Sequence, residues 1–154
     1  MLSFTLKSKA FKHEERIPDQ YTCTGKELSP PLNWEHVPEK TKSYAIIMQD
    51  LDTPIKALTH WILYNIPSEM TSLPEGVSLQ EPFSNGMIQG RNSMRKNEYM
   101  GPCPPFGKHR YKFTIYALDT LLEENTKMNK KKLLNAMDNH ILAQSDLLCV
   151  YAKK

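Results

Sequence analysis

The chain has 154 residues, 40% of them hydrophobic and 24% charged, and its formal net charge at pH 7 is +3. This length predicts a single domain over residues 1–154, with enough buried surface to fold without a metal or a disulfide. The charge is too small to indicate nucleic-acid binding, and no apolar run approaches the roughly 18 residues of a membrane span.

Several lysines near the C-terminus supply much of the excess positive charge. A solvated helix face explains this cluster better than a surface that binds a phosphate backbone, so we expect no nucleic-acid partner. We also expect no transmembrane segment. The lysines are Lys127, Lys130, Lys131, Lys132, Lys153 and Lys154.

The cysteines bear on the cellular compartment. Cys23, Cys103 and Cys149 are an odd number and show no CxxC spacing. The first twelve residues alternate polar and apolar side chains, without the long apolar core of a secretory signal. A reducing, cytoplasmic location is the simplest interpretation, although a mature secreted chain would also lack its signal.

The first third of the chain contains two predicted strands. Residues 3–7 alternate and indicate a short strand, whereas residues 18–38 form a long connection rich in Pro, Thr, Ser and Gly. Within that connection, Leu32 and Trp34 are expected to point inward. Residues 43–49 are an apolar run of strand length that ends at an Asp-rich turn.

The middle of the chain contains one further strand and a long irregular region. Residues 60–66 alternate, which predicts a strand ending at Pro67. Residues 68–100 contain repeated Pro and Gly and are expected to be mostly loop with short strands. The predicted strand places His60, Ile62, Tyr64 and Ile66 on one face, and Trp61, Leu63 and Asn65 on the other.

The C-terminal third adds two strands and the one convincing helix. Residues 111–118 alternate again, the helical spacing from Asn129 or Lys130 to about Leu142 predicts a helix capped by Asn129, and residues 147–152 predict a closing strand. The whole pattern is mainly β. It indicates an antiparallel β-sandwich with a peripheral C-terminal helix, rather than a βαβ nucleotide-binding fold.

An Asp-rich turn carries the first candidate functional side chains. Asp50 and Asp52 flank one residue, so in extended backbone both point to the same side, and their repulsion requires a cationic or N–H partner. His60 begins the strand that follows. Taken singly, these residues are more often a capping turn and a structural histidine.

A Pro/Gly loop at residues 101–107 carries the second set. Proline and glycine hold such a loop in one shape, and it delivers His109, Arg110 and Tyr111 to the start of a strand. Alternation sends His109 and Tyr111 to one side. Arg110 faces the other side, where we expect it to pair with one of the two aspartates as a structural brace.

Three chemistries fit two histidines and two aspartates. The first is an anion pocket in which imidazoles, a tyrosine hydroxyl and loop N–H groups donate hydrogen bonds. The second is a two-His-one-carboxylate metal site, but no HxH or HExxH spacing supports it, so we predict no metal and no cofactor. The third is a Cys103 nucleophile with His109 as base and Asp50 as orienter; no evident helix N-terminus lowers the pKa of that thiol.

These residues together resemble the phosphatidylethanolamine-binding protein family, in its compact bacterial and archaeal branch. The resemblance covers most of the chain, and the order and spacing of its motifs are highly specific. The motifs are residues 21–25 (YTCTG) with 29–34 (SPPLNW), residues 50–54 (DLDTP) with 59–61 (THW), and residues 101–105 (GPCPP) with 109–111 (HRY).

The resemblance implies a β-sandwich with a small surface pocket for phosphate-like or carboxylate anions. It also implies a cis peptide bond between Thr53 and Pro54, which costs only about 0.5–1 kcal/mol before proline. The ligand-binding residues that we predict on this basis are Asp50, Asp52, Thr53, Pro54, His60, Trp61, Gly101, Pro102, His109 and Tyr111.

The expected function is non-enzymatic binding of a small anion, such as phosphate, a phosphorylethanolamine-like headgroup or a phosphorylated ligand. By resemblance, the protein would regulate a kinase or protease partner. One alternative is a small hydrolase or transferase that uses a His-Asp acid/base pair in the same pocket. Another is a kinase- or protease-binding module whose contact surface lies outside the pocket, and a homodimer is also left open.

Overall fold

Two antiparallel sheets form the framework of the protein. The computed structural model describes residues 2–54 and 56–153. Its larger sheet has the strand order β6-β4-β3-β7-β8, and its smaller sheet has the order β1-β2-β5. The strands are β1 (Thr5–Lys7), β2 (Leu32–Glu35), β3 (Ser43–Asp50), β4 (Leu58–Pro67), β5 (Ser72–Leu73), β6 (Ile88–Gln89), β7 (His109–Leu118) and β8 (Ile141–Tyr151).

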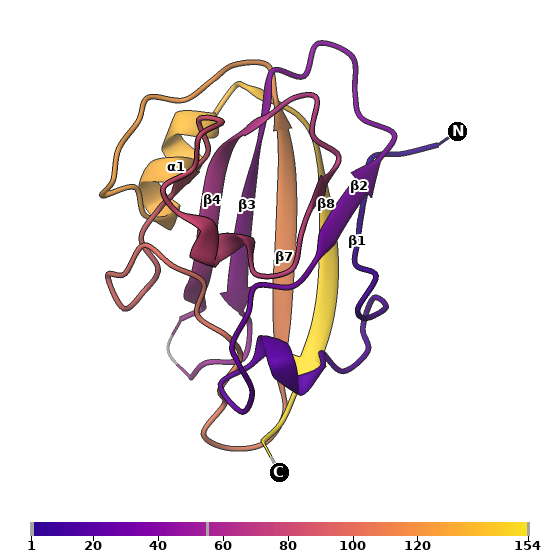
Figure 1. Ribbon diagram of the computed structural model, residues 1–154, viewed down its shortest axis with the longest axis vertical. Helices are drawn as coiled ribbons and strands as arrows, with labels where there is room; N and C mark the ends of the chain where they lie inside the picture. Colours follow the sequence, from indigo (N-terminus) through magenta and orange to yellow (C-terminus); the bar gives the residue numbers. More distant parts are fainter. Residues whose placement is uncertain (1, 55, 154) are drawn as a thin grey trace.

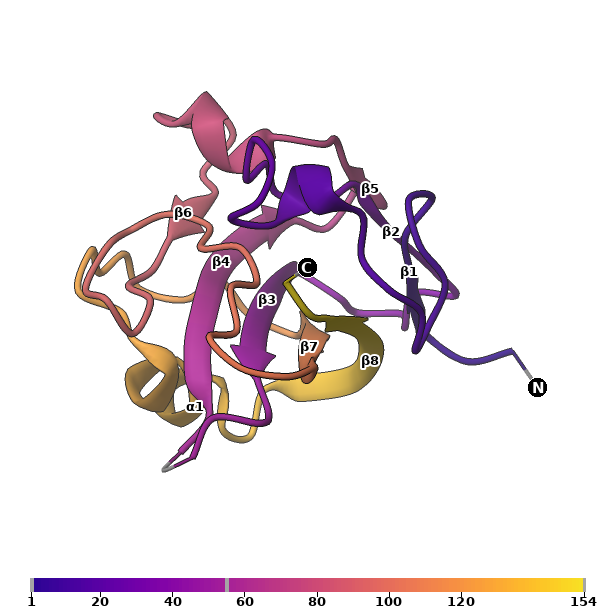
Figure 2. The same cartoon turned by 90° about the horizontal axis from the view of Figure 1, so that it is seen from below.

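The sheets and the helix form layers. The smaller sheet lies over one face of the larger sheet, and α1 (Lys130–Met137) lies on the opposite face (Figures 1 and 2). Two short 3-10 helices, η1 (Asp19–Tyr21) and η2 (Val77–Gln80), lie in the connections. The mainly β architecture with a C-terminal helix is therefore confirmed. In the described part of the chain, no helix has the length and apolar character needed to cross a membrane.

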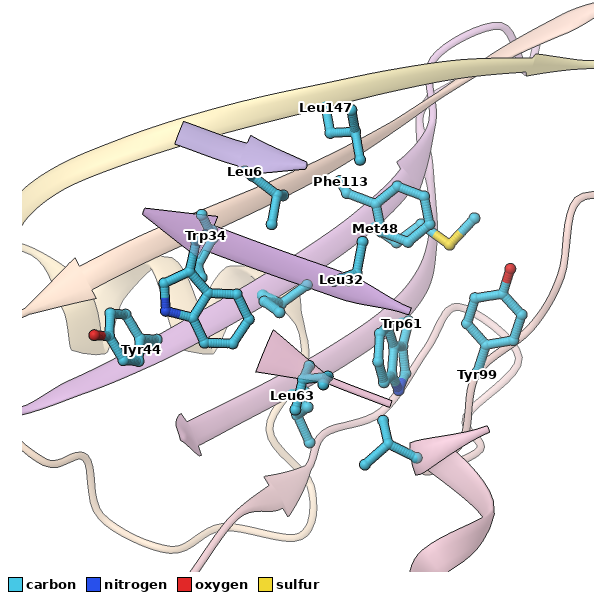
Figure 3. Close-up of a cluster of buried hydrophobic side chains, with 14 of the residues drawn as sticks. Leu6, Leu32, Trp34, Tyr44, Met48, Trp61, Leu63, Tyr99, Phe113 and Leu147 are labelled. Atoms are coloured by element: carbon cyan, nitrogen blue, oxygen red, sulfur yellow. The ribbon is translucent and has the colours of Figure 1, made fainter. Parts of the chain in front are cut away.

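Apolar side chains from both sheets fill the space between them. Figure 3 shows Leu6 and Trp34 of the smaller sheet facing Met48, Phe113 and Leu147 of the larger one. Such burial is the main stabilising contribution to a fold of this size. Leu32 and Trp34, the two expected inward anchors, are 1% and 2% exposed.

A second apolar cluster fixes the helix to the outer face of the larger sheet. Leu133 and Met137 are fully buried there against Ile62 and Tyr64 of β4. The Asn129 side chain caps the helix by accepting a hydrogen bond from the backbone N–H of Lys132. This N-cap is the one that the sequence predicts.

The helix and the last strand divide the C-terminal region differently from the prediction. The helix ends at Met137 rather than about Leu142, because Asn139 has a φ of 68°, in the left-handed region that ends helices. β8 then begins at Ile141, well before residue 147. Ile141 fits the helical spacing but is 40% exposed, so its apolar character indicates strand pairing as well as it indicates a helix face.

Strand alternation holds along β7 but fails in β4. Trp61 and Leu63 face the core between the sheets as expected, but Ile66 joins them there instead of pointing to the helix. Asn65 has a φ of 55°, and the β3–β4 register shifts nearby, so a bulge reverses the alternation. Residues 32–35, expected only as part of a connection, form strand β2.

Candidate functional site

Three segments that are distant in sequence meet at one end of the larger sheet. They are the segment that follows η1, the connection from β3 to β4, and the loop that precedes β7, all at the lower end of Figure 1. Together they enclose a cavity of about 770 Å³. Eight of the predicted site residues line it: Asp50, Asp52, Thr53, Pro54, His60, Gly101, His109 and Tyr111.

Two predicted site residues do not line the cavity. Trp61 is fully buried in the core, where its indole N–H donates to Gln89 and its ring contacts Tyr99 edge-on. Pro102 is buried, and its carbonyl oxygen accepts a hydrogen bond from the backbone N–H of Cys23. Pro102 therefore holds a residue of the cavity wall in place, whereas Trp61 belongs to the core.

Asp50 and His109 form a pair at the base of the cavity. The antiparallel register places Asp50, the last residue of β3, opposite Tyr111 of β7. Asp50 is 3% exposed, and one of its carboxylate oxygens lies 2.7 Å from Nδ1 of His109. Because a carboxylate oxygen accepts, Nδ1 carries the proton, and Nε2 is the nitrogen left for a ligand.

Asp52 makes a different ion pair, on the rim of the cavity. Its carboxylate accepts two hydrogen bonds from the Arg110 guanidinium, at 3.0 and 2.8 Å, and one from the Arg110 backbone N–H at 2.7 Å. These hydrogen bonds lower the pKa of Asp52 from 3.8 to about 2. Arg110 therefore joins the two turns, while its own side chain stays outside the cavity.

His60 reaches the cavity through a second bulge in β4. Met48 pairs with Trp61 and Gln49 pairs with Thr59, so His60 is the extra residue between them. Its side chain is therefore on the same side as Tyr111, and the two rings meet edge-on with centroids 5.4 Å apart. This is why His60 lines the cavity although its neighbour Trp61 faces the core.

The His60 ring is held in a defined state. It is 4% exposed, and Nδ1 lies 2.7 Å from the carbonyl oxygen of Met100, which can only accept. Burial is the main reason that its pKa is lowered from 6.5. At neutral pH the ring is therefore uncharged, with its proton on Nδ1 and a lone pair on Nε2.

The Tyr111 hydroxyl is buried near the Asp50 carboxylate and the Cys103 backbone, but it forms no hydrogen bond of ordinary geometry with either. Tyr111 is fully buried, and its hydroxyl is one of three buried side-chain polar groups in the described residues that find no hydrogen-bond partner. Burial first, and the nearby Asp50 carboxylate second, raise its pKa well above 10. The hydroxyl keeps its proton and can donate it to an acceptor in the cavity. An unsatisfied buried donor costs about 1–3 kcal/mol, which a bound acceptor would recover.

A disulfide bond between Cys23 and Cys103 connects two walls of the cavity. The two Cα atoms lie 5.5 Å apart, an ordinary separation for a disulfide. The proposed Cys103 nucleophile is therefore wrong, because its sulfur is already bonded. The bridge also removes the cysteine-based argument for a cytoplasmic location, since stable disulfides are rare in reducing compartments. The free cysteine, Cys149, is buried, and burial raises its pKa to about 12.

Glu27 is a cavity residue that sequence reasoning missed. One of its carboxylate oxygens accepts a hydrogen bond of 2.9 Å from the backbone N–H of Gly101. Only glycine fits at position 101, because a Cβ there would lie 2.7 Å from the Tyr21 carbonyl oxygen and 2.9 Å from Cγ of Glu27. The two residues are 74 positions apart. No local pattern could have paired them.

The exposed part of the cavity lining, its mouth, is mostly apolar, with Glu27 and Lys56 as charged exceptions. Its exposed apolar residues include Pro105, Met94 and Phe106, and the last two are 63% and 85% exposed. Within the described residues the cis peptide bond lies between Glu81 and Pro82, so the cis bond expected before Pro54 is wrong. The cis and trans forms before proline differ by so little energy that tertiary contacts decide between them.

Comparison with known proteins agrees with this fold. A family model described as phosphatidylethanolamine-binding protein matches residues 7–152. The chain belongs to the phosphatidylethanolamine-binding protein family. The resemblance that the motifs carry is thereby confirmed.

Proteins from three microorganisms match this chain over nearly their whole length. A "UPF0098 protein" of Methanothermobacter thermautotrophicus is 44% identical over 148 residues, which is 96% of this chain and 98% of that protein. A crystal structure of a family homologue from Chlamydia trachomatis superposes with a TM-score of 0.91 at 38% identity, covering 99% of both chains. Escherichia coli YbcL gives the same TM-score at 29% identity, covering 99% of this chain and all of YbcL.

Proposed function

We propose that this protein is a non-enzymatic binding protein whose cavity accepts a phosphate-like or carboxylate anion. The buried Tyr111 hydroxyl carries the proposal, because it makes no hydrogen bond of ordinary geometry and lies among residues that line the cavity. A ligand oxygen would satisfy it. In this proposal the Nε2 atoms of His60 and His109 complete the polar contacts, since the Nδ1 atoms of both rings are already engaged.

Anion binding on these terms is coupled to proton uptake. His60 is neutral in the free protein, and its Nε2 lone pair would repel an anion. A bound anion favours the imidazolium form, which donates from Nε2 and adds a positive charge beside the ligand. The affinity of the cavity for an anion should therefore rise as the pH falls. An anion that carries an acidic proton should donate it to Nε2 of His60 and bind through the same atoms.

The apolar mouth favours an anion that carries an organic group. Inorganic phosphate would contact only the polar base of the cavity. The exposed side chains of Met94 and Phe106 offer apolar surface to an organic group on the anion. A phospholipid headgroup and a phosphorylated ligand share this chemistry. Binding of a phosphorylated segment would also place a kinase or protease partner against the exposed Phe106 ring.

Calorimetry with O-phosphorylethanolamine tests the proposal. Replacing His109 with Ala should weaken binding by about 10- to 150-fold, because a charge-assisted hydrogen bond contributes roughly 1.5–3 kcal/mol. Tyr111→Phe should also weaken binding. Wild-type affinity in both variants would reject the site.

Two matched controls lie away from the cavity, one on strand β7 and one just beyond its far end. His140 forms a comparable pair with Asp119, with Nδ1 2.8 Å from the carboxylate oxygen, just beyond the other end of β7. Tyr116 lies on the opposite face of β7, in the cluster beneath the helix. His140→Ala and Tyr116→Phe should leave anion affinity unchanged. Equal losses in these variants would point to a general effect on stability.

A hydrolase or transferase is the second candidate, and the buried Asp50–His109 pair is the observation that favours it. A histidine that is oriented by an aspartate is the arrangement of a general base. Because Cys103 is in a disulfide, this base would have to activate a water molecule. Turnover of a phosphate or carboxylate ester that is lost in His109→Ala but kept in His140→Ala would establish this alternative. Binding without turnover favours the first proposal.

A further inference from the structure

A second hollow, which we call the basic hollow, lies beside the cavity and shares Lys56 and Leu58 with it. Its volume is about 610 Å³, within the range of small-molecule sites. Seven of its lining residues are cationic, and none is acidic. The cationic residues are Lys56, Arg91, Arg95, Lys127 and the three lysines at 130–132.

Backbone contacts hold the walls of the basic hollow together. The N–H of Ser93 donates to the carbonyl oxygen of Thr59 in β4, and the N–H of Thr59 donates back to the Ser93 hydroxyl. The N–H of Arg91 donates to the carbonyl oxygen of Met128, just before the helix. The fold therefore brings together cations from three separate segments. In the sequence, only the C-terminal lysines are visible as a cluster.

These cations lack anionic partners. Within residues 2–54 and 56–153, no ion pair includes any of the seven. Lys130 donates to the neutral amide of Gln49, and the buried Nε of Arg91 has no hydrogen-bond partner at all. Gathering like charges around one hollow is unfavourable by itself, and a bound anion would relieve the repulsion.

We propose that the basic hollow binds a small, multiply charged phosphate anion, such as a triphosphate group. The number of cations suits several phosphate charges, and the hollow is too small for a long polyanion to lie within it. No aromatic side chain lines the hollow, so a nucleobase would find no aromatic ring to stack on there. The phosphate chain is therefore the recognised group, and a nucleoside attached to it adds little. This site is independent of the proposed cavity ligand.

Calorimetry with sodium tripolyphosphate in a metal-free buffer tests the inference. Changing the exposed Lys127, Lys131 and Lys132 together to Gln should weaken binding at least about 10-fold, because it removes three charged donors. The matched control changes Lys9, Lys12 and Lys153 to Gln, which removes the same charge outside the hollow. That control should bind tripolyphosphate within about 2-fold of wild type, and ATP should bind within about 3-fold of tripolyphosphate.

Four outcomes would overturn the inference. They are undetectable tripolyphosphate binding, an equal loss in the control variant, a loss confined to His109→Ala, and tighter binding of a 20-nucleotide single-stranded DNA than of tripolyphosphate. The second would indicate attraction to net charge alone, and the third would assign the anion to the cavity. The fourth would indicate a nucleic-acid surface. Failure of the cavity proposal would leave the predicted losses at the basic hollow unchanged.

Discussion

The cavity and the basic hollow share two lining residues, but the carboxylates of the cavity are paired, whereas the cations of the basic hollow have no anionic partner in the described part of the chain. In the cavity the three lining carboxylates have partners: Asp50 pairs with His109, Asp52 with Arg110, and Glu27 with the Gly101 N–H. In the basic hollow, cations line the wall without a carboxylate among the lining residues. The two regions should therefore differ in what they bind and in how binding responds to solution conditions.

The two regions would recognise anions in different ways because their polar groups are arranged differently. Paired groups in a half-enclosed cavity leave a few directed atoms free, so binding should depend on ligand shape and on protonation. Unpaired surface cations act through summed charge, so binding should depend on ligand charge and fall with added salt. A substitution in one region therefore leaves the other region as an internal reference.

Removing the disulfide should produce the largest effect on stability. Cys23 and Cys103 are 80 residues apart, and a cross-link that closes a loop of this length contributes about 4 kcal/mol by its effect on the unfolded chain. We expect the Cys23→Ser/Cys103→Ser variant to lose roughly that much free energy of unfolding in urea titrations. The loosened wall should also weaken cavity binding, while tripolyphosphate binding at the basic hollow should persist in the folded variant.

Chemical reduction of the disulfide provides the control for this prediction. Dithiothreitol should destabilise the wild-type protein, because Cys103 is exposed, and should leave the double variant unchanged. An unchanged wild-type unfolding curve in the reducing agent would mean that the bridge does not form or does not stabilise the fold.

Changing Glu27 to Gln should make the cavity more like the basic hollow. The substitution keeps an oxygen that can accept from the Gly101 N–H but removes a negative charge from the cavity wall. We expect O-phosphorylethanolamine or phenyl phosphate to bind up to about 10-fold more tightly, because like charges a few ångströms apart repel by about 1 kcal/mol or more.

Glu124→Gln, a change of the same charge at an exposed position outside both regions, is the control for Glu27→Gln. It should leave phosphate-ester affinity within about 2-fold of wild type, the range expected from screened charges. Phenyl phosphate separates a general gain in anion binding from a contact with the ethanolamine amine. Weaker binding of phenyl phosphate to Glu27→Gln would show that the carboxylate organises the site instead of repelling the ligand.

Changing Asp52 to Asn should have the smallest effect on stability. The pKa of Asp52 is lowered from 3.8 to about 2, so its ion pair contributes stability above pH 3.8 that is lost as the pH falls through 2. Because the pair is partly exposed, we expect a cost of about 1 kcal/mol at pH 7 rather than the full value of the shift. Urea unfolding of Asp52→Asn, Arg110→Gln and the double variant should show a coupling that fades towards pH 2, and a pH-independent coupling would contradict this origin.

The sequence predicts much of the cavity because strand ends bring its main residues together. Asp50 ends β3, and His109 and Tyr111 begin its neighbour β7, so simple alternation and antiparallel pairing are enough to place them close together. The bulge at His60 depends on a register shift between β3 and β4, which no local pattern reveals. Trp61 was predicted in the wall by resemblance, whereas the alternation that places it beside Leu63 already indicates its core position.

The remaining features depend on contacts between distant segments. An odd number of cysteines gave no reason to pair Cys23 with Cys103, and Glu27 meets Gly101 only after the chain has folded. Arg91 and Arg95 join the C-terminal lysines through the backbone contacts of one loop. Sequence periodicity carries no information on such contacts, whereas the folded chain determines them all.

The most direct test of the account is an NMR titration of the histidine ring protons with O-phosphorylethanolamine over a range of pH. The account predicts saturable shifts at His60 and His109, no shift at His140, and an affinity that falls as the pH rises from the lowered pKa of free His60 towards its higher pKa in the complex. It also predicts that the ligand raises the pKa of His60, which burial lowers in the free protein. Flat titrations at both cavity histidines, or binding without any dependence on pH, would contradict the proposed anion pocket.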